Sequence, residues 1–99
     1  MAVVDIRTLT AEQVLAMPLP DLGLAALADW YETKAYSGIQ WVKGQDKRMG
    51  KVPEVKPALL EAVHWLNNQG YLAPDLNTTS HAHYFVTRLG KQALGVLPR

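Results

Sequence analysis

The stretch "KPALLEAVHWLNNQG", residues 56–70, constrains the fold more than any other part of the chain. Pro57 suits the first turn of a helix, and Gly70 suits the left-handed position just past its end. Steps of about 100° per residue place four apolar side chains on one face, namely Leu59, Ala62, Val63 and Leu66. The opposite face presents Glu61, His64 and Asn68, with Trp65 and Asn67 on its flanks. The stretch therefore predicts an amphipathic helix with one buried and one polar face.

Two short strands and a final helix are predicted after Gly70. The segment "YLA" is strand-like and is stopped by Pro74, whereas "PDLNTTS" is rich in turn-forming residues. The segment "AHYFV" alternates between two faces, as a half-buried strand does. Thr87 is the predicted N-cap of a short helix, "RLGKQAL", and we expect Leu89 and Leu94 to close the core there.

The first part of the chain predicts two helices after an extended lead-in. Thr10 and Gln13 have the spacing of a capping box, so a short helix is expected at about 11–17, ending before Pro18. A longer helix begins at Pro20 or Asp21. Its predicted inner face carries Leu24, Leu27 and Tyr31, with Trp30 at the edge, and its predicted outer face carries Ala25, Asp29 and Glu32.

Residues 36–56 are predicted to form an irregular basic loop. Three glycines and one proline interrupt any long helix in this segment. Five of its side chains are positively charged, namely Lys43, Lys47, Arg48, Lys51 and Lys56. Only Asp46 and Glu54 oppose them.

Composition restricts the class of protein. A chain of 99 residues buries one core rather than two, which predicts a single domain over 1–99. Cysteine is absent, which excludes disulfides, thiolate zinc sites and cysteine nucleophiles. No apolar run reaches the roughly 18 residues of a membrane span, and the start of the chain lacks the pattern of a signal peptide. The expected location is the cytoplasm.

Charge is divided unevenly along the chain. Residues 1–33 hold one arginine and five carboxylates, a net charge of −4. Residues 34–99 hold nine Lys or Arg and four carboxylates, a net charge of +5. A basic C-terminal two-thirds attracts polyanions. The competing interpretation is an ordinary solvated surface of mixed charge.

The order of these elements resembles the second half of bacterial winged helix-turn-helix domains. The resemblance is carried by Trp65, Leu66, Gly70, Tyr71, Leu72, Tyr84, Val86, Thr87, Gly90 and Leu94. More narrowly, "ALLEAVHWLNNQGYLAPD" followed by "HYFVTRLGKQAL" is similar to the winged-helix segment of uncharacterised abortive-infection-like bacterial proteins. The match covers residues 57–94 and, loosely, 19–34. Residues 36–56 do not show the short second helix of such domains.

The resemblance implies a mainly α fold with a small β-hairpin, a winged helix-turn-helix. It places a recognition helix at 57–69 and the wing at 73–82, with double-stranded DNA as the partner of a regulatory or accessory protein. Cations would neutralise phosphates while polar side chains read base edges. The predicted phosphate ligands are Lys43, Lys47, Arg48, Lys51 and Lys56. The predicted base-reading residues are His64, Asn67 and Asn68.

A second interpretation is a winged-helix interaction module that does not bind DNA, from a mobile element or a defence-related locus. Glu61 lies mid-face and repels phosphate, and the wing contains Asp75 without any Lys or Arg. A protein partner would then contact Glu61 and Trp65. A homodimer is a further interpretation, through the alanines on the outer face of the helix that begins at residue 20 or 21. Trp41 is predicted to fold back over Trp65.

Catalytic and metal chemistry find little support in the sequence. Ser37 and Ser80 lack the setting of a nucleophile, and the glycines and lysines of the basic segment do not form a phosphate-binding loop. His81 and His83 point the same way along a strand, and His64 supplies a third imidazole. We interpret these residues as surface histidines. No enzyme activity, metal or cofactor is therefore predicted.

Overall fold

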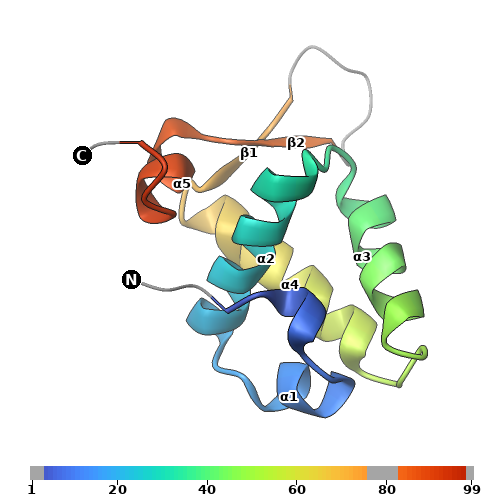
Figure 1. The fold of residues 1–99 in the computed structure, drawn as a ribbon. Coiled ribbons are helices and arrows are strands. Elements are labelled where there is room, and N and C mark those ends of the chain that lie inside the picture. The colour runs from blue at the N-terminus through green and yellow to red at the C-terminus, as the bar shows by residue number, and fades with distance from the viewer. Residues whose placement is uncertain (1–3, 76–82, 98–99) are drawn as a thin grey trace.

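The computed structural model describes residues 4–75 and 83–97 of the chain. Its elements are η1 (Ile6–Thr8), α1 (Ala11–Ala16), α2 (Leu19–Thr33), α3 (Gly38–Arg48), α4 (Val55–Asn68), β1 (Leu72–Pro74), β2 (Tyr84–Val86) and α5 (Arg88–Ala93) (Figure 1). The two strands form an antiparallel hairpin. The coarse prediction, a mainly α fold with a small hairpin, is confirmed.

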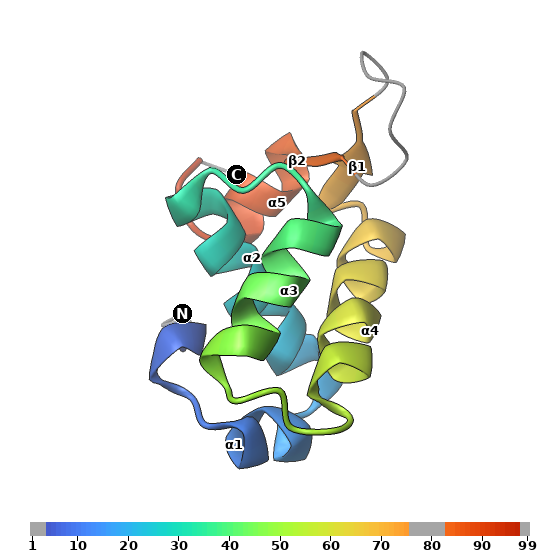
Figure 2. The ribbon, with the colours of Figure 1, turned by 90° about the vertical axis from the view of Figure 1, so that its right-hand side faces the viewer.

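Helix α2 lies at the centre of the molecule. Helix α4 packs across it, η1 and β2 contact its other sides, and α3 lies beside α4 (Figures 1 and 2). Leu27, Leu59 and Leu66 are completely buried in the core that α2 and α4 share. Burying one leucine side chain contributes about 1.5–3 kcal/mol, so this helix pair is a large source of stability.

The predicted helix ends are confirmed at three places. Thr10 Oγ1 accepts a hydrogen bond from Gln13 N at 3.2 Å, and Gln13 Oε1 accepts one from Thr10 N at 2.8 Å, which completes the capping box of α1. Thr87 Oγ1 caps α5 by accepting a hydrogen bond from Gly90 N at 3.0 Å. Gly70 follows α4 at a φ of 78°, a left-handed conformation that glycine adopts without strain.

The predicted irregular loop at 36–56 is wrong for most of its length, because residues 38–48 form helix α3. Ser37 caps the helix by accepting a hydrogen bond from Gln40 N at 3.3 Å. Trp41 and Val42 are buried and fix one face of the helix against the core. Tertiary packing therefore outweighs the weak helix propensity of this segment.

The glycines of α3 explain why local signals pointed away from a helix. Gly38 opens the helix in a buried position, Gly44 lies in its interior and Gly50 follows its end at a φ of 80°. Only Gly50 uses a conformation that disfavours other residues. At Gly44 an added Cβ would meet no atom within 4 Å, so this glycine weakens the helix without serving a contact.

The predicted faces of α2 are correct at Leu27, which is completely buried, and at Glu32, which is exposed, but they are wrong at Ala25, Asp29 and Tyr31. Ala25 and Ala26 are completely buried and Asp29 is only 4% exposed, whereas Tyr31 is exposed. The reason is the central position of α2, which is covered on more than one side, so a single apolar stripe does not describe it. A homodimer through exposed alanines of this helix therefore has no surface at Ala25 or Ala26.

Asp29 joins α2, α3 and the N-terminal segment. Its Oδ2 accepts hydrogen bonds from Trp41 Nε1 at 2.8 Å and from Gln45 Nε2 at 3.3 Å. Its Oδ1 lies 3.5 Å from Arg7 Nε, an ion pair that lacks hydrogen-bond geometry. A buried carboxylate is tolerated only when such partners compensate its lost hydration.

Arg7 extends this network to the surface. Its Nη2 lies 3.3 Å from Glu32 Oε1, and its Nε lies 3.2 Å from Asp5 Oδ1. Hydrogen bonds from the Arg7 side chain, and then from its backbone, lower the pKa of the Asp5 carboxyl. A lowered pKa means that this contact stabilises the fold above the ordinary pKa of aspartate and is lost as pH falls through the lowered value.

The hairpin is tied to the segment between α2 and α3. In its register Leu72 faces Val86 and Pro74 faces Tyr84. An isolated bridge pairs Ser37 with His83, and Tyr84 N donates a hydrogen bond to Tyr36 O at 2.9 Å. The hairpin therefore has a third short neighbour, which the sequence does not indicate.

Helix α5 closes the fold through Gly90 and Leu94. Leu94 packs against the core as predicted, but Leu89 is 50% exposed, so its predicted core position is wrong. A Cβ at Gly90 would come closer to the Tyr71 carbonyl oxygen than real Cβ atoms do. Gly90 thus permits α5 to lie directly against the backbone that leads into β1.

We expect opposite effects from alanine at two helical glycines. Gly44→Ala should raise the free energy of unfolding by about 0.5–1 kcal/mol, because alanine favours the helix and nothing obstructs its Cβ. Gly90→Ala should lower it by about 1–3 kcal/mol, because the new Cβ would collide with the Tyr71 carbonyl, and a backbone group cannot move aside as a flexible side chain can. Urea denaturation monitored by circular dichroism measures both. Equal effects would contradict the packing described at Gly90.

Candidate nucleic-acid interface

The solvent face of α4 carries the predicted base-reading residues. His64 and Asn68 are exposed and Asn67 is half-buried, so their placement agrees with the amphipathic pattern. Glu61 is exposed on the same face, and Leu60 beside it is 45% exposed. The face therefore offers amide and imidazole groups but has no cation between Glu61 and Asn68.

Two of the predicted phosphate ligands lie on the outer face of α3. Lys43 and Lys47 are one helical turn apart and both are exposed, while Trp41 and Val42 occupy the opposite face. Helices α3 and α4 are neighbours in the fold (Figure 2). Lys43 and Lys47 therefore lie on the helix next to α4.

Two further lysines lie at the junction of α3 and α4. Lys51 adopts a φ of 54° in the connection, and Lys56 lies in the first turn of α4. Glu54 precedes α4 without making a side-chain cap hydrogen bond, so its carboxylate does not cap the N–H groups at the helix start. Within residues 4–75 and 83–97, Lys43, Lys47, Lys51 and Lys56 form no ion pair.

Arg48 differs from these lysines because the fold uses its guanidinium. Its Nη2 donates to Ile6 O at 3.0 Å, and its Nη1 donates to Arg7 O at 3.3 Å. Its Nε and Nη2 also donate to Gln45 Oε1, at 3.1 Å and 2.9 Å. Arg48 therefore holds the N-terminal segment against α3, a role that its position in the sequence does not reveal.

Trp65, one of the predicted partner contacts, packs against the core. Its ring is half-buried and meets Tyr71 edge-on at a centroid distance of 6.0 Å. It also lies against Gly23 of α2, where an added Cβ would collide with the indole. Trp65 thus serves to join α4 to α2. Glu61 remains exposed.

The prediction that Trp41 covers Trp65 is wrong. Trp41 instead packs on Trp30, with ring centroids 5.8 Å apart. Its Nε1 is held by the buried Asp29 carboxylate. The sequence places Asp29 on the outer face of its helix, so it does not predict that this carboxylate would be buried and would hold Trp41 against Trp30.

The wing is described only at its base. Residues 76–82, which include His81 and most of the predicted wing, lie outside the described residues. At the base, Tyr36 Oη donates a hydrogen bond to the Asp75 carboxylate, and the Tyr36 ring lies 4.4 Å from that of His83. Within the described part of the chain, no three His, Asp or Glu residues gather as metal ligands would.

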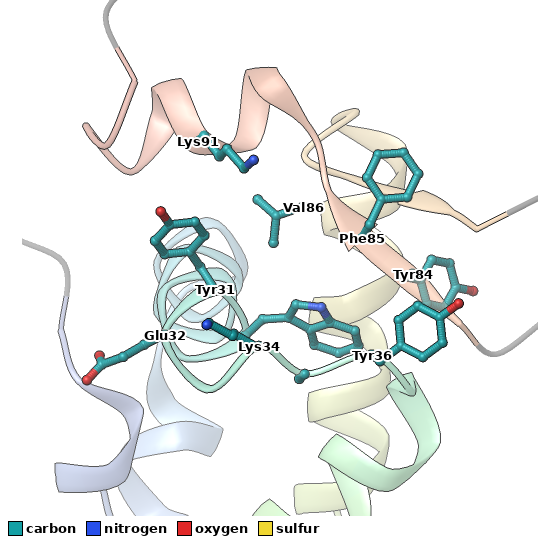
Figure 3. Close-up of a pocket in the computed structure, with 10 residues that line it drawn as sticks. Tyr31, Glu32, Lys34, Tyr36, Tyr84, Phe85, Val86 and Lys91 are labelled. Carbon is teal, nitrogen blue, oxygen red and sulfur yellow. The ribbon is translucent and has the colours of Figure 1, made fainter. Parts of the chain in front are cut away.

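The structure also has a cleft that the sequence did not predict. An open cleft of about 630 Å³ lies between the C-terminal end of α2, strand β2 and α5 (Figure 3). Tyr31, Lys34 and Tyr36 line it from the α2 side, and Phe85 and Lys91 line it from the other. The two tyrosines and the lysine of "YETKAY" were the available signal in the sequence, but only the fold brings them to β2.

The chain was compared with protein-family models, curated proteins and solved structures, and none matches it. None of the helices in the described part of the chain combines the length and the apolar character that crossing a membrane requires.

The different roles of two adjacent cations are testable by alanine substitution. We expect Arg48→Ala to lower the free energy of unfolding by about 1 kcal/mol, because hydrogen bonds to two backbone carbonyls are lost. The matched control is Lys47→Ala, which should change it by less than about 0.5 kcal/mol. Thermal and urea denaturation measure both values. A neutral Arg48→Ala would show that its hydrogen bonds do not hold the N-terminal segment.

Proposed function

We propose that this chain is a small DNA-binding regulatory or accessory protein that uses a winged helix. The observation that carries the proposal is a solvent-facing helix, α4, beside four exposed lysines that pair with no carboxylate in the described part of the chain. Free cations beside an exposed helix are what phosphate contacts on both sides of a groove require.

The order of elements supports the winged-helix interpretation. Helix α3, which the sequence did not indicate, supplies the short helix before the proposed recognition helix α4. The hairpin follows α4 directly, and the Ser37–His83 bridge joins it to the segment before α3. In a winged helix these parts hold the recognition helix against the major groove, which is wide enough to admit an α-helix.

The chemistry of the two helices favours backbone contacts over base reading. Lys43, Lys47, Lys51 and Lys56 would neutralise phosphates, while Asn67, Asn68 and His64 would meet base edges. Glu61 opposes phosphate on the same face. Affinity is therefore expected to come mainly from charge, with modest sequence preference.

A salt titration tests the proposal. If four lysines neutralise phosphates, the logarithm of the affinity for a random duplex should fall against the logarithm of salt with a slope of about −3 to −4. Lys43→Ala combined with Lys47→Ala should make the slope shallower by about two, because two contacts are removed. Fluorescence anisotropy with a labelled duplex provides the measurement.

The matched control removes two charges away from the α3–α4 junction. Lys34→Gly combined with Arg88→Ala leaves the four lysines intact, and glycine suits the left-handed backbone at position 34. This variant should keep the original slope. Equal slopes in the two double variants, or no binding at about 50 mM salt, where electrostatic affinity is strongest, would rule the proposal out.

A protein-interaction module is the second candidate. Leu60 and Glu61, adjacent and exposed on α4, favour it because an apolar side chain beside a carboxylate suits a protein surface better than DNA. Under this function the partner covers the exposed face of α4, and the lysines of α3 are irrelevant to binding.

Glu61→Lys separates the two candidates. For DNA binding, the reversal removes a repulsive charge and adds a cation, so affinity at low salt should rise several-fold and the salt slope should steepen by about one. The control is Glu12→Lys, the same change at an exposed position of α1, a helix that carries none of the residues assigned to DNA, and it should have a smaller effect. An unchanged duplex affinity in Glu61→Lys would favour the interaction module.

A further inference from the structure

The cleft beside β2 is rich in aromatic rings. Five of the eight aromatic side chains of the chain line it, namely Trp30, Tyr31, Tyr36, Tyr84 and Phe85. Tyr31, Tyr36 and Phe85 are 40%, 42% and 49% exposed, so part of each residue is open to solvent at the cleft. Figure 3 shows Tyr31 on one side of the opening and Tyr36 with Phe85 on the other. Such walls favour a flat apolar ligand, and the volume of about 630 Å³ lies within the range of small-molecule sites.

The cleft also carries uncompensated positive charge. Lys34 and Lys91 line it from opposite sides (Figure 3). Glu32 is the only carboxylate among the described residues that line it, and that side chain is engaged by Arg7 Nη2 at 3.3 Å. Neither lysine forms an ion pair within residues 4–75 and 83–97. An anionic group on a bound molecule would therefore meet two free amines.

The backbone at Lys34 supports a role for its side chain. Lys34 ends α2 at a φ of 56°, a left-handed conformation that glycine or asparagine adopts more readily than lysine. A residue that departs from this preference at the edge of a cleft is a reasonable mark of function. Here the unfavourable backbone places an ammonium group at the opening.

A buried donor provides an independent observation. Trp30 is only 1% exposed and lines the cleft, yet its Nε1–H has no hydrogen-bond partner among the described residues. Buried indole N–H groups ordinarily find an acceptor. The Trp30 indole is therefore a group of the cleft lining whose N–H the described residues leave without an acceptor, and its signal can report what binds there.

We propose that this cleft binds a small planar aromatic molecule that carries a carboxylate. The ring system lies between Tyr31 and the pair Tyr36 and Phe85, and the carboxylate is shared by Lys34 and Lys91. This inference does not rest on DNA binding, because none of the four lysines assigned to phosphate lines the cleft.

The test uses 2-naphthoate as the probe and 2-naphthamide, which has the same ring without the charge, as its control. Isothermal titration gives the affinities, and the indole N–H signals in a ¹H–¹⁵N spectrum report the site. We expect naphthoate to bind at least about fivefold more tightly than the amide, as one or two exposed ion pairs allow. The Trp30 indole signal should move, while that of Trp65 should not.

Two double variants make the test specific. Lys34→Gly with Lys91→Gln should abolish the preference for naphthoate over the amide, and glycine keeps the backbone at position 34 unstrained. Lys43→Gln with Lys47→Gln removes the same charge from α3 and should leave both affinities unchanged. Equal affinity for the acid and the amide, a Trp30 signal that stays fixed at millimolar naphthoate, or an equal loss in the two variants would overturn the proposal.

Discussion

The buried carboxylate of Asp29 is the constraint on which the arrangement of the helices depends. It accepts hydrogen bonds from Trp41 and Gln45 of α3 and lies 3.5 Å from the Arg7 guanidinium. Three segments that are distant in sequence therefore meet at this one carboxylate. Leaving the Trp41 Nε1–H without this acceptor would place an unsatisfied donor in the core. The position of α3, and with it the direction in which Lys43 and Lys47 point, follows from that contact.

The same contact sets the floor of the cleft. Because Trp41 is held by Asp29, its ring packs on Trp30 at 5.8 Å, and Trp30 in turn meets Tyr84 of β2 edge-on at 6.5 Å. This row of rings runs from α3 through α2 to the hairpin. Helix α3, which carries Lys43 and Lys47, and the cleft proposed for an aromatic acid are thus connected by one row of packed rings.

Local rules predicted much of this fold, and tertiary packing decided the rest. The caps at Thr10 and Thr87, and the glycine after α4, follow from neighbours within a few residues. Helix α3 was missed because its glycines, which are visible locally, argue against a helix. The burial of Trp41, which outweighs them, depends on contacts with distant residues and cannot be read from the local sequence. The cleft was missed for the same reason, since residues near 31–36 meet residues near 85–91 only in the folded chain. The exposure of the lysines could be expected because charge is visible in sequence, but the hydrogen bonds from Arg48 to backbone carbonyls could not.

Tyr36 has two duties that its place in the sequence conceals. Its ring forms one wall of the cleft, while its hydroxyl donates to Asp75, which follows β1, and its carbonyl accepts from Tyr84 N of β2. A molecule that turns this ring must therefore disturb the anchor at which the hairpin leaves the body of the protein. The wall of the cleft and the base of the hairpin are therefore joined through the contacts of one residue, Tyr36.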